Sequence, residues 1–123
     1  MIYKTKVFAS LTKKEILSDN DLINACEQMS KGLFDAELGG NVFKKRIAVG
    51  NKGKSAGYRT IVGAVIGDKY FFLYEFAKSD RANINGKEKL ALKELAKEFL
   101  AFNQTELNQL VDDGELIEVV NYE

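Results

Sequence analysis

Residues 42–59, VFKKRIAVGNKGKSAGYR, form the part of the sequence best suited to binding an anion. This segment contains no Asp or Glu, although the formal net charge of the whole chain is zero. Its glycines allow the backbone to approach a ligand closely, and its cations make a local positive surface. We therefore expect it to bind a polyanion. Its basic residues are Lys44, Lys45, Arg46, Lys52, Lys54 and Arg59.

A solvated charged face is the simplest alternative explanation for these residues. Their concentration argues against it, because they flank a glycine-rich turn, and Lys78 and Arg81 follow an aromatic segment further on. Residues 58–66 and 69–77 are predicted to pair as a hairpin, which would bring Arg59 close to the strand end that carries Ala77 and Lys78. The basic side chains would then converge on one edge of a sheet. Converging cations without carboxylates suit a phosphodiester backbone better than a protein surface.

The opposite charge is concentrated at the end of the sequence. Residues 103–123 contain six acidic side chains and no Lys or Arg. Solubility explains most acidic surface segments. Two alternatives stay open: the segment folds back over the basic loop, or it keeps nucleic acid away from the opposite face.

Composition excludes several kinds of chemistry. The chain has no histidine and one cysteine, so we expect no zinc site and no Ser-His or Cys-His nucleophile. We predict no metal and no other cofactor, and any acid–base chemistry must use Lys, Tyr, Asp or Glu. Cys26 follows Leu22 and precedes Met29 and Leu33 at helical spacing, which indicates a small core residue.

Length and hydropathy predict one domain, residues 1–123. The first residues, MIYKTKVFASLTKK, lack the apolar core of a signal peptide, and no apolar run is long enough to span a membrane. We therefore expect a cytoplasmic protein.

Periodicity and turn residues predict the elements in outline. The expected strands are 2–9, 42–49, 58–66 and 69–77, with a strand or extended tail over LIEVV near the end. The expected helices are 19–30, 87–102 and 105–111. Helix starts are indicated at Thr12 with Glu15, at Ser18 with Asp21 and at Asn85. Gly32 is expected to end the first long helix, and Gly67 to form the hairpin turn.

The ordered set KKRIA, GKSAGYRTIV and FAKSDRANI resembles the RelE-type branch of the RelE/ParE toxin superfamily, including its HigB-like members. The resemblance covers nearly the whole chain, as far as ELIEV. It implies an α+β fold in which a small twisted antiparallel sheet packs against N- and C-terminal helices. It also implies a toxin of a type II toxin–antitoxin pair, with a cognate antitoxin, expected to be a small helix-turn-helix protein.

The implied activity is a metal-independent endoribonuclease that acts on messenger RNA in the ribosomal decoding site and inhibits translation. The 2′-hydroxyl attacks the adjacent phosphate, which leaves a 2′,3′-cyclic phosphate and a 5′-hydroxyl. Crowded cations lower the pKa of a lysine and so provide a base. The resemblance assigns the base or phosphate clamp to Lys52 and Lys54, and stabilisation of the phosphorane to Arg59 and Arg81. RNA-binding roles are expected for Lys44, Lys45, Arg46, Tyr58 and Lys78.

The chain departs from the best-known RelE pattern at two positions. Ser79 stands where that pattern has an arginine, and Asn85 stands where it has a tyrosine that stacks on or orients the nucleotide. Tyr58, Tyr70 and Tyr74 are the tyrosines available to replace it, although each is expected to be a core or cross-strand aromatic. Two other functions therefore stay open: a non-catalytic relative that binds RNA or an antitoxin, and a ParE-like poison of DNA gyrase.

Overall fold

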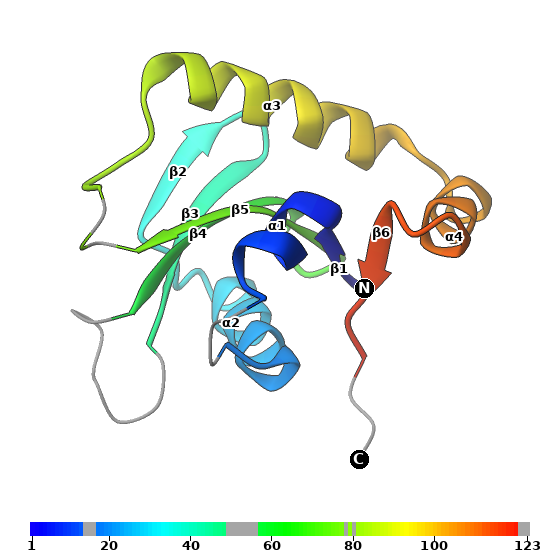
Figure 1. The fold of residues 1–123 in the computed structure, drawn as a ribbon, viewed down its shortest axis with the longest axis horizontal. Helices are drawn as coiled ribbons and strands as arrows, with labels where there is room; N and C mark the ends of the chain where they lie inside the picture. The colour runs from blue at the N-terminus through cyan, green and yellow to red at the C-terminus, as the bar shows by residue number, and fades with distance from the viewer. Residues whose placement is uncertain (14–16, 49–56, 78, 80, 121–123) are drawn as a thin grey trace.

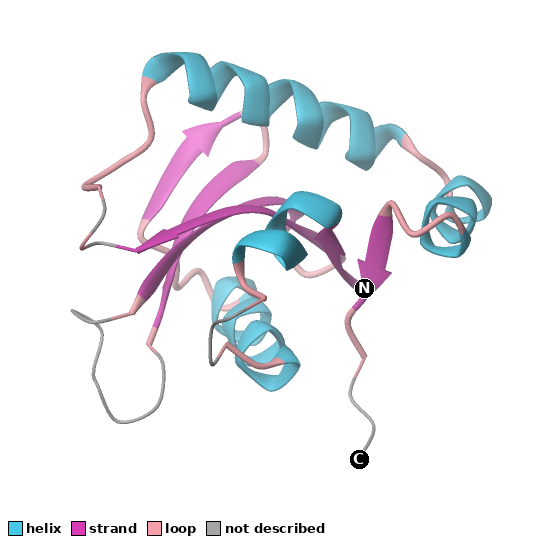
Figure 2. Cartoon of the chain, viewed as in Figure 1, coloured by secondary structure: helices cyan, strands magenta, loops and turns pink. Residues whose placement is uncertain are grey.

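A mixed six-stranded sheet with helices on both faces forms the centre of the protein (Figures 1 and 2). This architecture was obtained as a computed structural model, which describes residues 1–13, 17–48, 57–77, 79 and 81–120. The sequence prediction of an α+β fold is confirmed. No helix within these ranges is long and apolar enough to cross a membrane.

The strand order is β2-β3-β4-β5-β1-β6. Neighbouring strands are antiparallel except for β1 and β5, which are parallel. The sheet is therefore mixed, whereas the sequence predicted an antiparallel sheet. The elements are β1 (Ile2–Thr5), α1 (Lys6–Leu11), α2 (Asp19–Ser30), β2 (Ala36–Gly39), β3 (Val42–Ile47), β4 (Tyr58–Val65), β5 (Lys69–Ala77), α3 (Gly86–Ala101), α4 (Gln104–Asp112) and β6 (Leu116–Glu118).

The prediction of a strand over residues 2–9 is wrong beyond Thr5. The Thr5 hydroxyl accepts a hydrogen bond from the backbone N–H of Phe8 at 3.0 Å and so caps α1. Phe8 is completely buried, which shows that core packing outweighs the β-propensity of the segment. Thr12 ends α1 instead of starting a helix, and Glu15 lies outside the described residues.

Helix α2 has the predicted bounds. Ser18 and Asp21 form a reciprocal capping box, and Gly32 follows the helix with a φ of +83°. Cys26 is buried as predicted, and this burial raises the pKa of its thiol to about 12. Leu33 does not share that environment, because it lies beyond the helix and is 57% exposed.

Strands β4 and β5 form the predicted hairpin around Gly67, whose φ is +86°. A register shift between Ile61 and Val62 leaves Leu73 as the extra residue of β5. Strand β3 ends at Ile47, and the predicted strand end at Val49 lies outside the described residues. Strand β2 was not predicted as a strand, and it pairs with β3 at the edge of the sheet.

Helices α1 and α2 cover one face of the sheet, and α3 covers part of the other (Figure 1). Asn85 caps α3 as predicted. On the α3 face, Phe99 stacks on Phe71 with ring centroids 5.3 Å apart, and Ala96 is completely buried. Nearer the other end of this face, Arg46 and Arg59 are only half-buried, whereas Phe76 is buried. That end of the sheet contains the candidate site.

Candidate nucleic-acid interface

The alternation of β3 separates its basic residues between the two faces of the sheet. Val42 packs in the core cluster under α3, whereas Phe43 and Ile47 pack in the cluster under α2. Because successive side chains of a strand point to opposite faces, Lys44 and Arg46 lie on the α3 face with Val42. Lys45 lies on the α2 face.

Four residues line a pocket of about 190 Å³ on the α3 face, here called the basic pocket. They are Asp35, Lys44, Arg46 and Arg59. Asp35 is held against β3, because its backbone N–H donates to the carbonyl of Lys44 at 2.9 Å. Its carboxylate accepts a hydrogen bond from the backbone N–H of Arg46 and contacts the Arg46 guanidinium at 3.4 Å. The pocket thus combines three cations with one carboxylate, and it attracts anions.

Arg59 is the cation of this pocket that has a buried donor atom without a partner among the described residues. In the strand register it lies opposite Arg46 on β3 and opposite Phe76 on β5. Its Nη1 atom is buried and has no hydrogen-bond partner within the described part of the chain. A buried donor without an acceptor costs free energy, and an anion in the basic pocket would supply the acceptor.

Arg81 lies beside the same end of β5. Its guanidinium carbon is 5.8 Å from the centre of the Phe76 ring. The guanidinium also forms a two-hydrogen-bond ion pair with Glu88 of α3. This pair raises the pKa of Arg81 and lowers that of Glu88, with a smaller contribution from the nearby Tyr74 to the pKa of Arg81. Phe76 therefore links the two arginines, with Arg59 paired to it across the strands and Arg81 above its ring.

The three tyrosines considered as replacements lie in different environments. Tyr74 pairs with Ile61 and shares the α3 face with Arg59, and its side chain is half-buried. Tyr58 precedes Arg59 and therefore points to the α2 face. Tyr70 is buried, where its hydroxyl meets that of Ser30 and accepts from the backbone of Gly67. Tyr74 is thus the one of the three on the face of the basic pocket.

Lys45 is buried on the opposite face from the basic pocket. It is only 7% exposed, and its ammonium donates to the carbonyl of Leu33 at 2.9 Å. The buried residues Thr60 and Glu75 follow it in register across β4 and β5. This polar row anchors the strand ends, and Lys45 is not among the residues that line the basic pocket.

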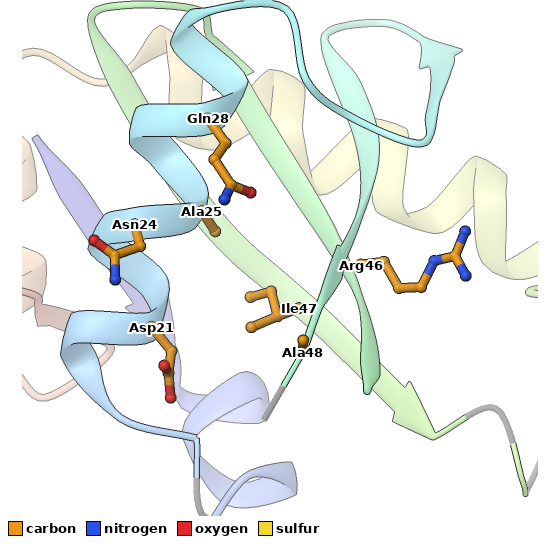
Figure 3. A pocket seen from close by; sticks show the side chains of 7 residues that line it. All are labelled: Asp21, Asn24, Ala25, Gln28, Arg46, Ile47 and Ala48. Atoms are coloured by element: carbon orange, nitrogen blue, oxygen red, sulfur yellow. The ribbon is translucent and has the colours of Figure 1, made fainter. Parts of the chain in front are cut away.

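A second hollow on the α2 face contrasts with the basic pocket (Figure 3). Asp21, Asn24 and Gln28 of α2 line it together with Ile47. Figure 3 shows that the Arg46 side chain points away from α2, so its guanidinium belongs to the basic pocket instead. The hollow offers amides and a carboxylate, which makes it less suited to phosphate than the α3 face.

Three of the predicted site residues, Lys52, Lys54 and Lys78, lie outside the described residues, and their roles stay predictions. Asn85 has a structural role, because its side chain accepts from the backbone of Glu88 and caps α3. Asp35 and Glu88 were not foreseen from the sequence. The capping spacing of Asn85 and Glu88 indicated a helix start there, but no sequence signal indicated that either acid meets an arginine.

Comparison with known protein families identifies the family of this chain. A sequence model described as the RelE toxin of the RelE / RelB toxin-antitoxin system matches residues 1–119. The chain belongs to the RelE toxin family. It is therefore a toxin of a toxin–antitoxin system, and membership implies an antitoxin partner. RelE toxins are generally endoribonucleases. No curated protein matches the sequence.

Proposed function

We propose that this RelE toxin is a ribosome-dependent endoribonuclease that cuts messenger RNA at the α3 face of its sheet. The buried Nη1 of Arg59, without a partner among the described residues, carries the proposal. It is a charged donor in a pocket with two further cations, where a phosphate of RNA would satisfy it.

Electrostatic stabilisation is the task that the described residues suit best. When the 2′-hydroxyl attacks, negative charge builds up on the non-bridging oxygens of the phosphorane. Arg59 donates to these oxygens from the pocket, and Arg46 and Lys44 hold the adjoining backbone. Arg81, whose charge is balanced by Glu88, adds its remaining N–H donors from above Phe76. Donors fixed in place before the reaction stabilise such charge strongly, because they need no reorganisation.

Proton transfer completes the reaction. A base takes the proton of the 2′-hydroxyl, the bond from phosphorus to the 5′-oxygen breaks, and an acid protonates that oxygen. The products are a 2′,3′-cyclic phosphate and a 5′-hydroxyl. We assign the base or phosphate clamp to Lys52 and Lys54, whose pKa values neighbouring cations would lower. Tyr74 is the candidate for contact with the nucleotide, since it shares the face of Arg59.

Two other functions compete with this proposal. The protein could be a non-catalytic relative that binds RNA or an antitoxin, or a ParE-like poison of gyrase. Both use the same fold. The basic pocket favours an RNA function over gyrase poisoning, because its convergent guanidinium groups suit phosphate recognition.

Purified components separate these functions. The toxin is mixed with ribosomes programmed with a defined message, and primer extension maps the cut. Polynucleotide kinase then labels the new 5′ end without prior phosphatase treatment, as a 5′-hydroxyl allows. We expect cleavage by the wild type and by the control Lys69→Ala, at the far end of the hairpin, but not by Arg59→Ala. Intact message would contradict the proposal, and loss of supercoiling by gyrase in a parallel assay would support the ParE-like function.

A further inference from the structure

The guanidinium of Arg81 is held by several contacts at once. Its Nη1 donates to Oε2 of Glu88 at 2.9 Å, and its Nη2 donates to Oε1 at 2.5 Å. Its Nε donates to the carbonyl of Asn83 at 3.0 Å. The ring of Phe76 lies beneath the guanidinium carbon. An arginine side chain has several rotatable bonds, and these contacts fix the plane of its guanidinium.

Glu88 is itself fixed by the start of α3. Its carboxylate accepts from the backbone N–H of Asn85 at 2.9 Å, and its own backbone N–H donates to the Asn85 side chain at 2.8 Å. The same carboxylate therefore completes the capping box of α3 and binds Arg81. Side chains of Arg81 and Glu88 are both about one third exposed, at 32% and 29%, so the pair lies at the surface and within reach of a ligand.

The pair leaves Arg81 able to bind a phosphate. A guanidinium has five N–H donors, and the hydrogen bonds of Arg81 to Glu88 and Asn83 use three of them. Arg59 lies opposite Phe76 in register, so Arg81 above that ring borders the same end of the sheet as Arg59. An ordered Arg81 would meet a phosphate held by Arg59 without first losing rotamer freedom.

We propose that Glu88 is a positioning residue, whose carboxylate holds the Arg81 guanidinium above Phe76 so that it can stabilise RNA phosphate beside Arg59. This inference rests on the proposed ribonuclease function. The same contact allows the opposite role for Glu88. Its carboxylate would then compete with phosphate for the Arg81 guanidinium and so mask it. Positioning and masking predict opposite effects of removing the charge.

Steady-state cleavage by the full chain on programmed ribosomes distinguishes them. Glu88→Gln keeps an acceptor for Asn85 but loses the charge. We expect its kcat to fall about tenfold or more, because a loosely held group contributes less to the transition state, with KM changed less than twofold. The matched control is Glu94→Gln, an exposed acid of the same helix, which should behave as wild type. A rise in activity of Glu88→Gln would establish masking and overturn positioning.

A double-mutant cycle tests whether Glu88 acts through Arg81. The double variant Glu88→Gln/Arg81→Ala should be no slower than Arg81→Ala alone, because the carboxylate then has no guanidinium to hold. Equal losses in both backgrounds would show that Glu88 acts independently of Arg81, and would overturn the inference.

Nuclear magnetic resonance tests whether Glu88 fixes the Arg81 guanidinium, independently of RNA cleavage. We expect a resolved Nη–H signal of Arg81 in slow exchange with water in the wild type and in Glu94→Gln, and its loss in Glu88→Gln, because the Nη groups are the ones that donate to Glu88. An unchanged signal in Glu88→Gln would contradict the inference. If the wild type does not cleave RNA but the signal behaves as expected, then the ribonuclease proposal fails while the positioning of Arg81 by Glu88 stands.

Discussion

Arg46 and Arg59 lie directly opposite each other across β3 and β4. Like charges in such a cross-strand pair destabilise a sheet. Asp35 offsets part of this repulsion by its contacts with Arg46, whereas Arg59 keeps a buried Nη1 without a partner within the described residues. An arrangement that costs stability in the free protein suits a site where a bound anion removes the cost.

The first prediction follows from this pair. Arg59→Met keeps much of the buried side-chain stem but removes the charge. We expect its affinity for single-stranded RNA to fall about tenfold or more, since charge-assisted hydrogen bonds are lost. We expect its free energy of unfolding to stay within about 0.5 kcal/mol of the wild type or to rise. Fluorescence anisotropy and urea denaturation measure the two quantities, with Lys69→Met as the control. A strongly destabilised variant would contradict the argument.

The second prediction concerns the end of the β3–β4 pair. A methyl group at Gly57 would overlap the backbone carbonyl of Ile47. Backbone atoms cannot move aside easily, so Gly57→Ala should force the strand ends apart and lower the free energy of unfolding by about 1–3 kcal/mol. RNA affinity should fall too, because Arg46 and Arg59 lie on those strand ends.

Gly86 provides the matched control. An added methyl group there meets no atom within 4 Å, so Gly86→Ala should match the wild type in a thermal melt. Equal stability of the two variants would refute the close approach at Gly57.

The third prediction is the pH dependence of the Arg81–Glu88 pair. Arg81 lowers the pKa of Glu88 below its ordinary value of 4.5. A carboxyl group whose pKa is lower in the folded state stabilises the fold above its unfolded pKa, and this contribution disappears as the pH falls through the folded pKa. Wild type should therefore be more stable than Glu88→Gln at pH 7, and the difference should shrink below pH 4.5. Urea titrations at several pH values measure it. A difference independent of pH would exclude the ionic contribution.

The fourth prediction concerns Cys26. This residue is 4% exposed, and burial raises the pKa of its thiol to about 12. The thiolate is the reactive form, so in the native protein at pH 8 the thiol should react with a chromogenic disulfide at least about 100-fold more slowly than in denaturant. Glutathione, whose thiol is fully exposed, calibrates the reagent. Rapid reaction of the native protein would show that α2 does not keep Cys26 packed against the sheet.

Local signals in the sequence were sufficient for the elements with strong caps and turns. The capping box of Ser18 and Asp21 and the turn at Gly67 predicted α2 and the β4–β5 hairpin correctly. The parallel pairing of β1 with β5 could not be predicted, because it joins segments about 70 residues apart and has no turn to mark it. The switch from strand to helix at Thr5 depends on the burial of Phe8, which is a tertiary effect.

The candidate site was predictable only where a local signal, the hairpin register, positioned its residues. The hairpin register correctly placed Arg59 near Ala77. Alternation separates Lys45 from Arg46, but the sequence did not show which face would be buried. The contacts of Asp35 with Arg46 and of Glu88 with Arg81 join different elements, so only the folded arrangement reveals them.

Inducing the toxin in cells and mapping messenger RNA 5′ ends across the transcriptome tests most directly whether the α3 face cuts messenger RNA through Arg59. We predict growth arrest with codon-phased cuts that end in a 5′-hydroxyl, retained by Lys69→Ala and lost in Arg59→Ala. Arrest with intact message and stalled replication, or the same cuts by a stably folded Arg59→Ala, would contradict the claim.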